Sequence, residues 1–424
     1  MRRERRGLAG VMLGPMAGPH TALLMATLAL AAVGCARGGT RHPAEERRLD
    51  DAATAEVAAS AFARGAAAAS QTAEDPAEIL AQAEAALAAD EAARAVALFG
   101  RVLSGPLSPE QAAPAWIGLA QSHEKLRDCT AAIRAYGTYL ARFPEGEHAL
   151  VASARRGACE AELEDWERSA STFHEIAQLP DQLPSVQVEA LAREGYALFM
   201  LDRFDEADER LARADEIYER AVAEQRERFA SYYFVGMARF YRAAILHRRF
   251  REVEIRLPEK VMEKAFQAKL ELLVAAQDAY NHTIEAKHVF WVSAAGFQLG
   301  HLFSELYDAL MYAPVPEWLD ARQREIYYEE LKKQLRPVIT KAIWVFEKNL
   351  ETARRLGYDN EFVERTEAKL GHLQAVLLSD DATLGKPNQR LARESDEEID
   401  APPETDPEGS AADRKLFVPR PTPL

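Results

Sequence analysis

The chain has 424 residues, of which 48% are hydrophobic and 28% are charged, a balance typical of a folded protein with a sizeable core. Its formal net charge is −15 and its isoelectric point is about 5.3. Nucleic-acid binding needs a basic face, and no such face is evident in an acidic chain of this kind. We therefore expect no nucleic-acid partner.

The amino terminus has the three parts of a secretory signal peptide. Basic residues crowd the first six positions, and a short apolar segment runs from Thr21 to small residues before Cys35. The apolar segment is too short to remain in a bilayer as a spanning helix. We expect residues 1–34 to be removed on export.

Residues 32–35, Ala-Val-Gly-Cys, resemble the bacterial lipobox, with Ala where Leu is more usual at its first position. The resemblance implies cleavage before Cys35 and attachment of lipid to that cysteine. Ala36 follows, where Asp would argue for retention in the inner membrane, so we expect an outer-membrane anchor with the chain facing the periplasm. The alternative is an ordinary signal peptide followed by an incidental cysteine. Residues 35–75 are low-complexity and Ala-rich, and we expect a flexible tether.

Residues 76–221 contain four units with one recurring spacing. In the second unit, counted from Ala113, Trp116 stands at position 4, Ala132 at position 20 and Tyr136 at position 24. Two antiparallel helices approach closely only where one presents a small side chain and the other a bulky one. The same small and bulky pair recurs in the other three units as Ala95 and Phe99, Ser169 and Phe173, and Ala207 and Leu211. Position 8, where the two helices of a unit cross most tightly, reads Ala83, Ala120, Gly157 and Gly195.

These units resemble the tetratricopeptide repeat, a 34-residue helix pair. The resemblance implies an all-α helical solenoid whose concave groove binds segments of other proteins. The family pattern places in that groove Ile117, Gln121 and Glu124 of the second unit, and Tyr196, Phe199 and Met200 of the fourth. Exposed aromatic side chains there would form a partner-binding strip. The alternative is that the next helix covers them with Phe229 and Tyr233.

Cys129 and Cys159 are an even pair in an oxidising compartment once Cys35 is lipidated. Cys129 lies near the start of the second helix of its unit, and Cys159 lies late in the first helix of the next. Stacked antiparallel helices bring these positions to comparable height. We hypothesise a disulfide, and the alternative is two buried thiols that pack as small apolar groups.

Residues 222–378 keep a helical period with longer helices, so we expect a divergent helical extension. We predict one helix over 221–255, a second from 259 to about 288 and a third that follows it and runs to 312. Two more helices are predicted over 320–356 and 360–378. Ala342 and Phe346 repeat the second-helix spacing, and Trp291–Gly300 is a plausible partner segment, which suggests a fifth repeat. The last helix would cap the array.

Residues 379–424 form the end of the chain, dominated by acids and prolines between Glu394 and Glu408. Such a composition cannot assemble a core, so we expect a disordered acidic tail. Its end, Leu416–Pro421, is either a short docking motif or a terminus without function.

No catalytic or metal-binding constellation stands out along the chain. His282, His288 and His301 are spaced so that they do not share one helical face. The motifs of solenoid-bearing lytic transglycosylases are absent, and Ser304-Glu305 has the reverse of their order. We therefore expect no enzyme, no metal, no cofactor and no small-molecule substrate.

Two groups of exported proteins resemble this arrangement. One is the tetratricopeptide lipoprotein of the outer-membrane β-barrel assembly machine, and the other is the periplasmic tetratricopeptide component of the myxobacterial gliding-motility complex. The long aromatic second half, with Tyr327-Tyr328 and Ala342–Phe346, resembles the latter more. The resemblance implies a scaffold that binds other envelope proteins and is held to the membrane through the lipid on Cys35.

Overall fold

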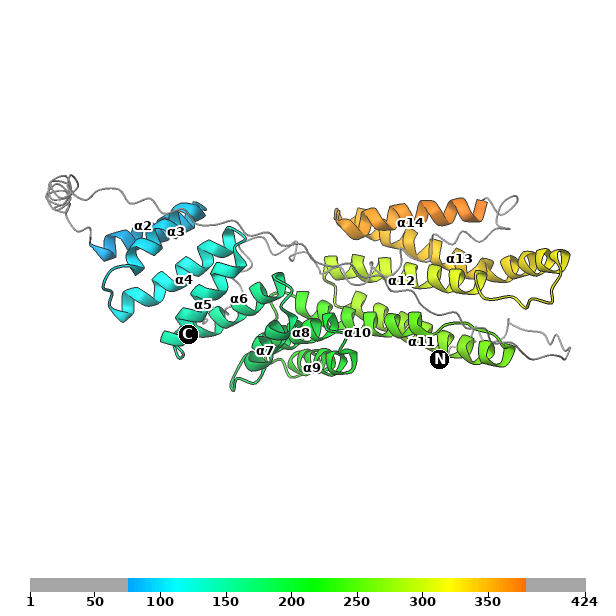
Figure 1. The fold of residues 1–424 in the computed structure, drawn as a ribbon, viewed down its shortest axis with the longest axis horizontal. Coiled ribbons are helices and arrows are strands. Elements are labelled where there is room, and N and C mark those ends of the chain that lie inside the picture. Colours follow the sequence, from blue (N-terminus) through cyan, green and yellow to red (C-terminus); the bar gives the residue numbers. More distant parts are fainter. Residues whose placement is uncertain (1–74, 379–424) are drawn as a thin grey trace, which may run out of the picture. The chain divides into compact units, whose positions relative to one another are not determined.

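The computed structural model describes residues 75–378, and all regular structure in that range is α-helical (Figure 1). The expected signal peptide, Cys35, the tether up to residue 74 and the tail from 379 lie outside the described residues. The helices are α2 (Pro76–Ala88), α3 (Ala92–Leu103), α4 (Pro109–Lys125), α5 (Cys129–Arg142), α6 (Ala149–Glu162), α7 (Trp166–Ala177), α8 (Pro184–Met200), α9 (Phe204–Ala223), α10 (Tyr233–Glu252), α11 (Glu259–Glu285), α12 (Val289–Met311), α13 (Ala321–Leu356) and α14 (Glu361–Leu378). The all-α prediction is confirmed for this range.

Local sequence explains where several helices begin and end. Ser108 and Gln111 form a reciprocal capping box at the start of α4, and Asp320 and Gln323 form another at the start of α13. Gly357 ends α13 in the left-handed conformation that glycine adopts without strain. None of the described helices is both long enough and apolar enough to cross a membrane.

Helices in the described range pack chiefly against their neighbours in the chain. Each helix contacts the next one, and alternate helices also touch in the pairs α2 with α4, α8 with α10, α10 with α12, and α12 with α14. The core is accordingly a succession of local clusters, such as the one around Ala132 and Tyr136 and the one around Ala95 and Phe99.

Glycines allow these neighbouring helices to approach. A Cβ atom placed on Gly157 of α6 would lie 2.9 Å from the ring of Phe173 on α7. The same test on Gly195 of α8 brings Leu211 of α9 to 2.5 Å. Both glycines occupy the position at which the sequence predicts the closest crossing, and both bulky partners are the ones that the spacing predicts.

The predicted helix over 221–255 is wrong. α9 ends at Ala223, and the chain turns through Gln225, whose φ is 52°, before α10 begins at Tyr233. Glu227 holds this turn in place because it accepts hydrogen bonds from the backbone and the hydroxyl of Ser185, at 2.9 and 2.6 Å. The single predicted helix is therefore two, α9 and α10, joined by this turn.

The new boundary creates a helix pair that the sequence reading missed. α10 and α11 pack together, and Ala276 and Tyr280 of α11 have the same four-residue spacing as Ala132 and Tyr136. Both Ala276 and Tyr280 are fully buried. The small and bulky spacing thus continues beyond the four predicted units.

The end of α10 is capped by a buried cation. Lys269 of α11 donates hydrogen bonds from Nζ to the carbonyls of Phe250 and Val253, at 2.6 and 3.0 Å. These carbonyls lack partners within their own helix, so the ammonium group satisfies them and favours the negative end of the helix dipole. Burial lowers the pKa of Lys269 to about 8.

Adding one methyl group at a helix crossing tests this packing. A Cβ on Gly236 of α10 would lie 2.4 Å from the buried Trp291, so Gly236→Ala should destabilise the fold by about 1–3 kcal/mol. Gly137→Ala in α5 meets open space, and should instead stabilise it by about 0.5–1 kcal/mol. Urea unfolding followed by circular dichroism measures both, and equal effects of the two variants would contradict the packing.

Candidate functional site

The predicted groove of the second unit is partly used by the fold itself. Ile117 is buried, and Gln121 is half-buried. Glu124 accepts hydrogen bonds from the hydroxyl of Tyr136 and from Nη1 of Arg155, the latter at 2.9 Å. Burial and the neighbouring Glu124 raise the pKa of Tyr136 well above its usual value. The Glu124 carboxylate therefore joins α4, α5 and α6 and is not free for a partner.

The predicted aromatic strip of the fourth unit is covered. Tyr196 and Phe199 are only 7% and 2% exposed. The ring of Tyr241 on α10 lies over both, with centroids 4.7 Å from Tyr196 and 5.1 Å from Phe199. The prediction of an exposed strip at these residues is wrong, and Met200 beside them is half-buried.

The covering residue also differs from the alternative considered for this strip. Phe229 packs against Tyr218, with ring centroids 5.1 Å apart, and Tyr233 packs against Trp291 at 5.3 Å. Tyr241, in the middle of α10, is therefore the residue that covers α8.

Cys129 and Cys159 are buried thiols in the structure. The Cys129 thiol donates a hydrogen bond to Oε2 of Glu162 at 3.0 Å. A hydrogen bond with Cys129, together with burial, raises the pKa of the Cys159 thiol. Both thiols lie in the core cluster around Ala132 and Tyr136, and the disulfide stays a prediction.

A ladder of ion pairs joins α9 to α10. Arg249 binds Asp205 at 2.6 Å, and Arg242 binds Asp208 at 2.9 Å. The last rung is buried, since Arg239 is only 4% exposed. Arg239 binds Asp215 at 2.6 Å and also pairs with Glu219. The two outer rungs are partly exposed and contribute little to stability, whereas the buried rung is costly to break.

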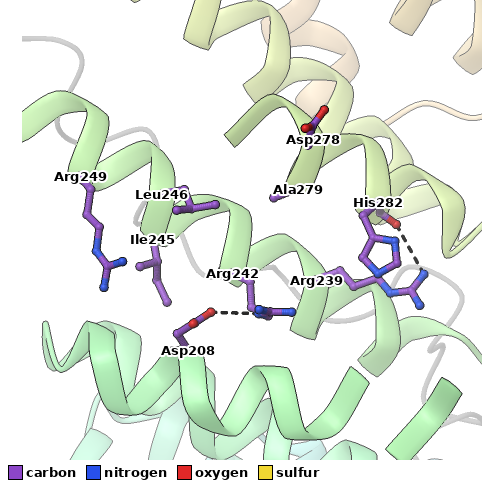
Figure 2. A pocket seen from close by; sticks show the side chains of 9 residues that line it. All are labelled: Asp208, Arg239, Arg242, Ile245, Leu246, Arg249, Asp278, Ala279 and His282. Carbon is purple, nitrogen blue, oxygen red and sulfur yellow. Dashed lines mark hydrogen bonds and ion pairs between the residues drawn. The ribbon is translucent and has the colours of Figure 1, made fainter. Parts of the chain in front are cut away.

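A pocket opens above this ladder, between α9, α10 and α11 (Figure 2). Its volume is about 270 Å³, and its lining residues are Asp208, Arg239, Arg242, Ile245, Leu246, Arg249, Asp278, Ala279 and His282. Pockets that enclose drug-sized ligands are usually larger, at about 300–1,000 Å³. A pocket of this size, lined by apolar residues and arginines, suits a side chain of a partner protein better than a free small molecule.

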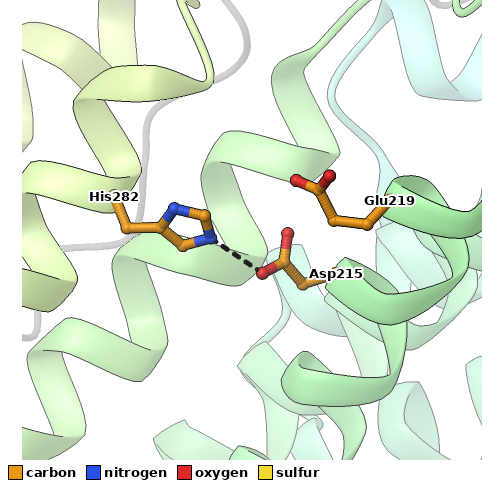
Figure 3. A group of neighbouring side chains, drawn as sticks. All are labelled: Asp215, Glu219 and His282. Atoms are coloured by element: carbon orange, nitrogen blue, oxygen red, sulfur yellow. Dashed lines mark hydrogen bonds and ion pairs between the residues drawn. The ribbon is translucent and has the colours of Figure 1, made fainter. Parts of the chain in front are cut away.

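Three side chains beside the pocket have the composition of a metal site. Figure 3 shows Asp215 and Glu219 projecting from α9 toward His282 of α11, and their ligand atoms lie within 4.8 Å of one another. Nε2 of His282 lies 3.0 Å from Asp215. However, the guanidinium of Arg239 already pairs with both carboxylates and stacks on the ring of Tyr218, 5.4 Å from its centroid. A metal ion would have to displace this buried cation, so the group is better explained as an ion-pair cluster.

A second polar cluster lies in the interior between α10, α11 and α12. His247 is fully buried, with Nε2 2.7 Å from Glu305 and Nδ1 3.1 Å from the hydroxyl of Tyr280. Burial lowers the pKa of His247, so a neutral ring donates to Glu305 and accepts from Tyr280. Arg251 pairs with the other oxygen of Glu305, and Nε2 of His301 lies 3.2 Å from that same oxygen. All these groups are committed to one another, which points to a structural role.

The comparisons with known proteins do not add a relative. No protein-family model matches the chain, and no curated protein matches it significantly.

Sequence reasoning missed both polar clusters. The contacts between helices in these clusters join residues 20 to 67 positions apart in the chain, as in Arg239 with Glu219 and His282 with Asp215. Only the arginine spacing on α10 was a usable signal, since Arg239, Arg242 and Arg249 recur near the helical period and face a similar series of acids on α9.

The buried rung of the ladder gives a double-variant test. Arg239→Met should destabilise the fold by about 3–5 kcal/mol, because it leaves Asp215 buried without its main partner. Adding Asp215→Leu removes that charge and should restore much of the lost stability. Urea unfolding measures both, and a loss below about 1 kcal/mol for the single variant would mean that the pair is solvated.

Glu189 of α8 gives a pH test of burial at the covered strip. Burial raises the pKa of Glu189 to about 7, although the ion pair with Arg193 at 2.8 Å acts to lower it. The folded chain then keeps a proton that the unfolded chain releases, so stability falls as pH rises from about 4.5 to about 7. Glu189→Gln cannot titrate, and it should gain up to about 3 kcal/mol over the parent across this window. If the free energies of unfolding of the parent and the variant changed with pH in parallel, the burial of the Glu189 carboxyl would be contradicted.

Proposed function

We propose that this chain is an exported, lipid-anchored scaffold, built as a tetratricopeptide-like solenoid, that binds other proteins of the cell envelope. The observation that carries the proposal is the repeated fit of a small residue on one helix against a bulky one on its neighbour. It recurs at Gly157 with Phe173, at Gly195 with Leu211 and at Gly300 with Phe346. Repeated helix pairs that contact only near neighbours support a solenoid.

A repeat array offers partners an extended surface, and the pocket between α9, α10 and α11 is the place we propose for contact. Arg242 and Arg249 stand at its edge with 36% and 40% of their side chains exposed. Arginine next to apolar side chains, here Ile245 and Leu246, is common among the residues that dominate protein interfaces. The exposed ion pairs with Asp208 and Asp205 are weak, so carboxylates of a partner can replace them at little cost.

The membrane attachment rests on the residues around Cys35, which resemble a lipobox. Among envelope machines, we favour one similar to the gliding-motility complex, because of the long aromatic second half. The β-barrel assembly machine is the second candidate, on the same resemblance.

Purification from intact envelopes tests the scaffold. We expect the full chain, crosslinked in cells, to recover an outer-membrane barrel or motility proteins together with itself. Arg242→Glu should reduce that recovery severalfold, because it reverses the charge at the pocket edge. Arg94→Glu on α3 is the matched control, because Arg94 is 63% exposed and lies far from Arg242 in the chain. This variant should leave the recovery unchanged.

Labelling with a radioactive fatty acid tests the anchor in the same cells. The parent should incorporate label and fractionate with the outer membrane, and Cys35→Ser should incorporate none. A chain without lipid, or one purified alone with glycan-cleaving activity, would contradict the proposed function.

A further inference from the structure

The outer face of α13 carries exposed apolar and basic side chains in a single line. The helix buries Leu335, Ile339 and Phe346 on one side. On the opposite side, at helical spacing, lie the residues that we call the α13 stripe: Arg322, Ile326, Lys333, Pro337, Lys341 and Trp344. Glu330 lies on the same side and forms an exposed pair with Lys333 at 3.6 Å, which contributes little. Ile326 is 57% exposed and Trp344 is 48% exposed. The two lie 18 residues apart, about 27 Å along the helix, so a ligand that covers both must be an extended segment.

Part of the stripe extends beyond the helix that packs beneath it. Gly300 of α12 faces Phe346 and Gly296 faces Asn349, so the two helices run antiparallel and Met311, the last residue of α12, falls opposite about Leu335. Residues 321–334 therefore continue for roughly 21 Å past the end of α12. Figure 1 shows this yellow end of α13 running past both α12 and α14.

The stripe is basic in an acidic chain. Residues 321–341 contain six Lys and Arg and three Asp and Glu, whereas the whole chain has a net charge of −15. The ammonium of Lys341 lies 4.2 Å from the centroid of the Trp344 ring. A ligand that fits must therefore combine carboxylates with apolar groups.

Residues 394–418 of the same chain have that chemistry. Residues 394–413 contain nine Asp and Glu and no Lys or Arg. Leu416, Phe417 and Val418 follow shortly after, with Pro402, Pro403 and Pro407 among the acids.

The segment also starts within reach of the stripe. The short turn between α13 and α14 makes α14 run back along α13 (Figure 1), and Asn349 donates a hydrogen bond to Thr366 at 3.0 Å where the two helices meet. Leu378 follows Thr366 by 12 residues and Pro337 precedes Asn349 by 12, so α14 ends about level with Pro337, in the middle of the stripe. Residues 379–393 span up to roughly 50 Å when extended, enough to pass around a helix about 10 Å wide.

We propose that residues 394–418 bind along the α13 stripe of their own molecule. Their carboxylates pair with Lys333 and Lys341, and Phe417 and the prolines cover Ile326 and Trp344. Attachment to α14 raises the effective concentration of the segment to the millimolar range, so modest contacts suffice. The inference concerns this chain alone and does not depend on the proposed scaffold role.

Zero-length coupling with a carbodiimide tests the proposal, because it joins only amines and carboxylates in direct contact. An equal mixture of unlabelled and nitrogen-15 full-length chain is coupled, digested and read by mass spectrometry. We expect Lys333 and Lys341 to link to carboxylates in 394–413 within one molecule, with a yield that falls at high salt. Lys260 and Lys264, exposed on α11, are the matched control amines and should stay at background.

A variant separates this binding from chance contact. Trp344→Ala keeps both lysines, and should lower the linking of Lys341 about tenfold through the lost burial of the ring. Trp318→Ala is the control, since Trp318 is 70% exposed and precedes α13, off the stripe. Links that join labelled to unlabelled chains, links spread evenly over all exposed lysines, or no effect of Trp344→Ala would overturn the proposal.

Discussion

The structure depends on one kind of contact, in which a residue with little or no side chain lies against a bulky residue of a neighbouring helix. Within helix pairs it joins Gly157 to Phe173 and Gly300 to Phe346, and between pairs it joins Gly236 to Trp291. Without a Cβ the helices come close enough for the ring to fill the space between them, and interiors packed this densely leave no room for added atoms. Because the same contact recurs along the chain, each helix is stabilised mainly by its neighbours.

Charge adds a second layer where the repeats become irregular. α10 departs from the four-unit pattern, and it is held to α9 by three arginines and to α12 by the cluster around Glu305. The pair of Arg239 with Asp215 and the cluster around Glu305 are buried, so they stabilise one arrangement of the long helices, whereas the pairs of Arg242 and Arg249 are partly exposed and contribute little. The pocket above the ladder and the outer side of α13 remain as surfaces for other chains.

The sequence predicted well whatever depends on spacing within one helix. The spacing of Ala132 and Tyr136 follows from the helical period alone, and the predicted end of the helix at residue 356 follows from the glycine after it, which adopts a left-handed conformation without strain. The exposure of Tyr196 and Phe199 could not be predicted, because it is decided by Tyr241, 45 and 42 residues further along. The break before α10 depends on the contact of Glu227 with Ser185, 42 residues away. By contrast, Ala276 and Tyr280 carried a readable signal that was missed.

Native-state hydrogen exchange tests most directly the claim that stability passes from neighbour to neighbour. The account predicts that amides in α2, α3 and α14, at the ends of the array, exchange through openings of low free energy. Protection should rise stepwise toward α8, α10 and α12, which contact one another as well as their neighbours in the chain. Amides of all described helices exchanging through one common global opening would contradict it.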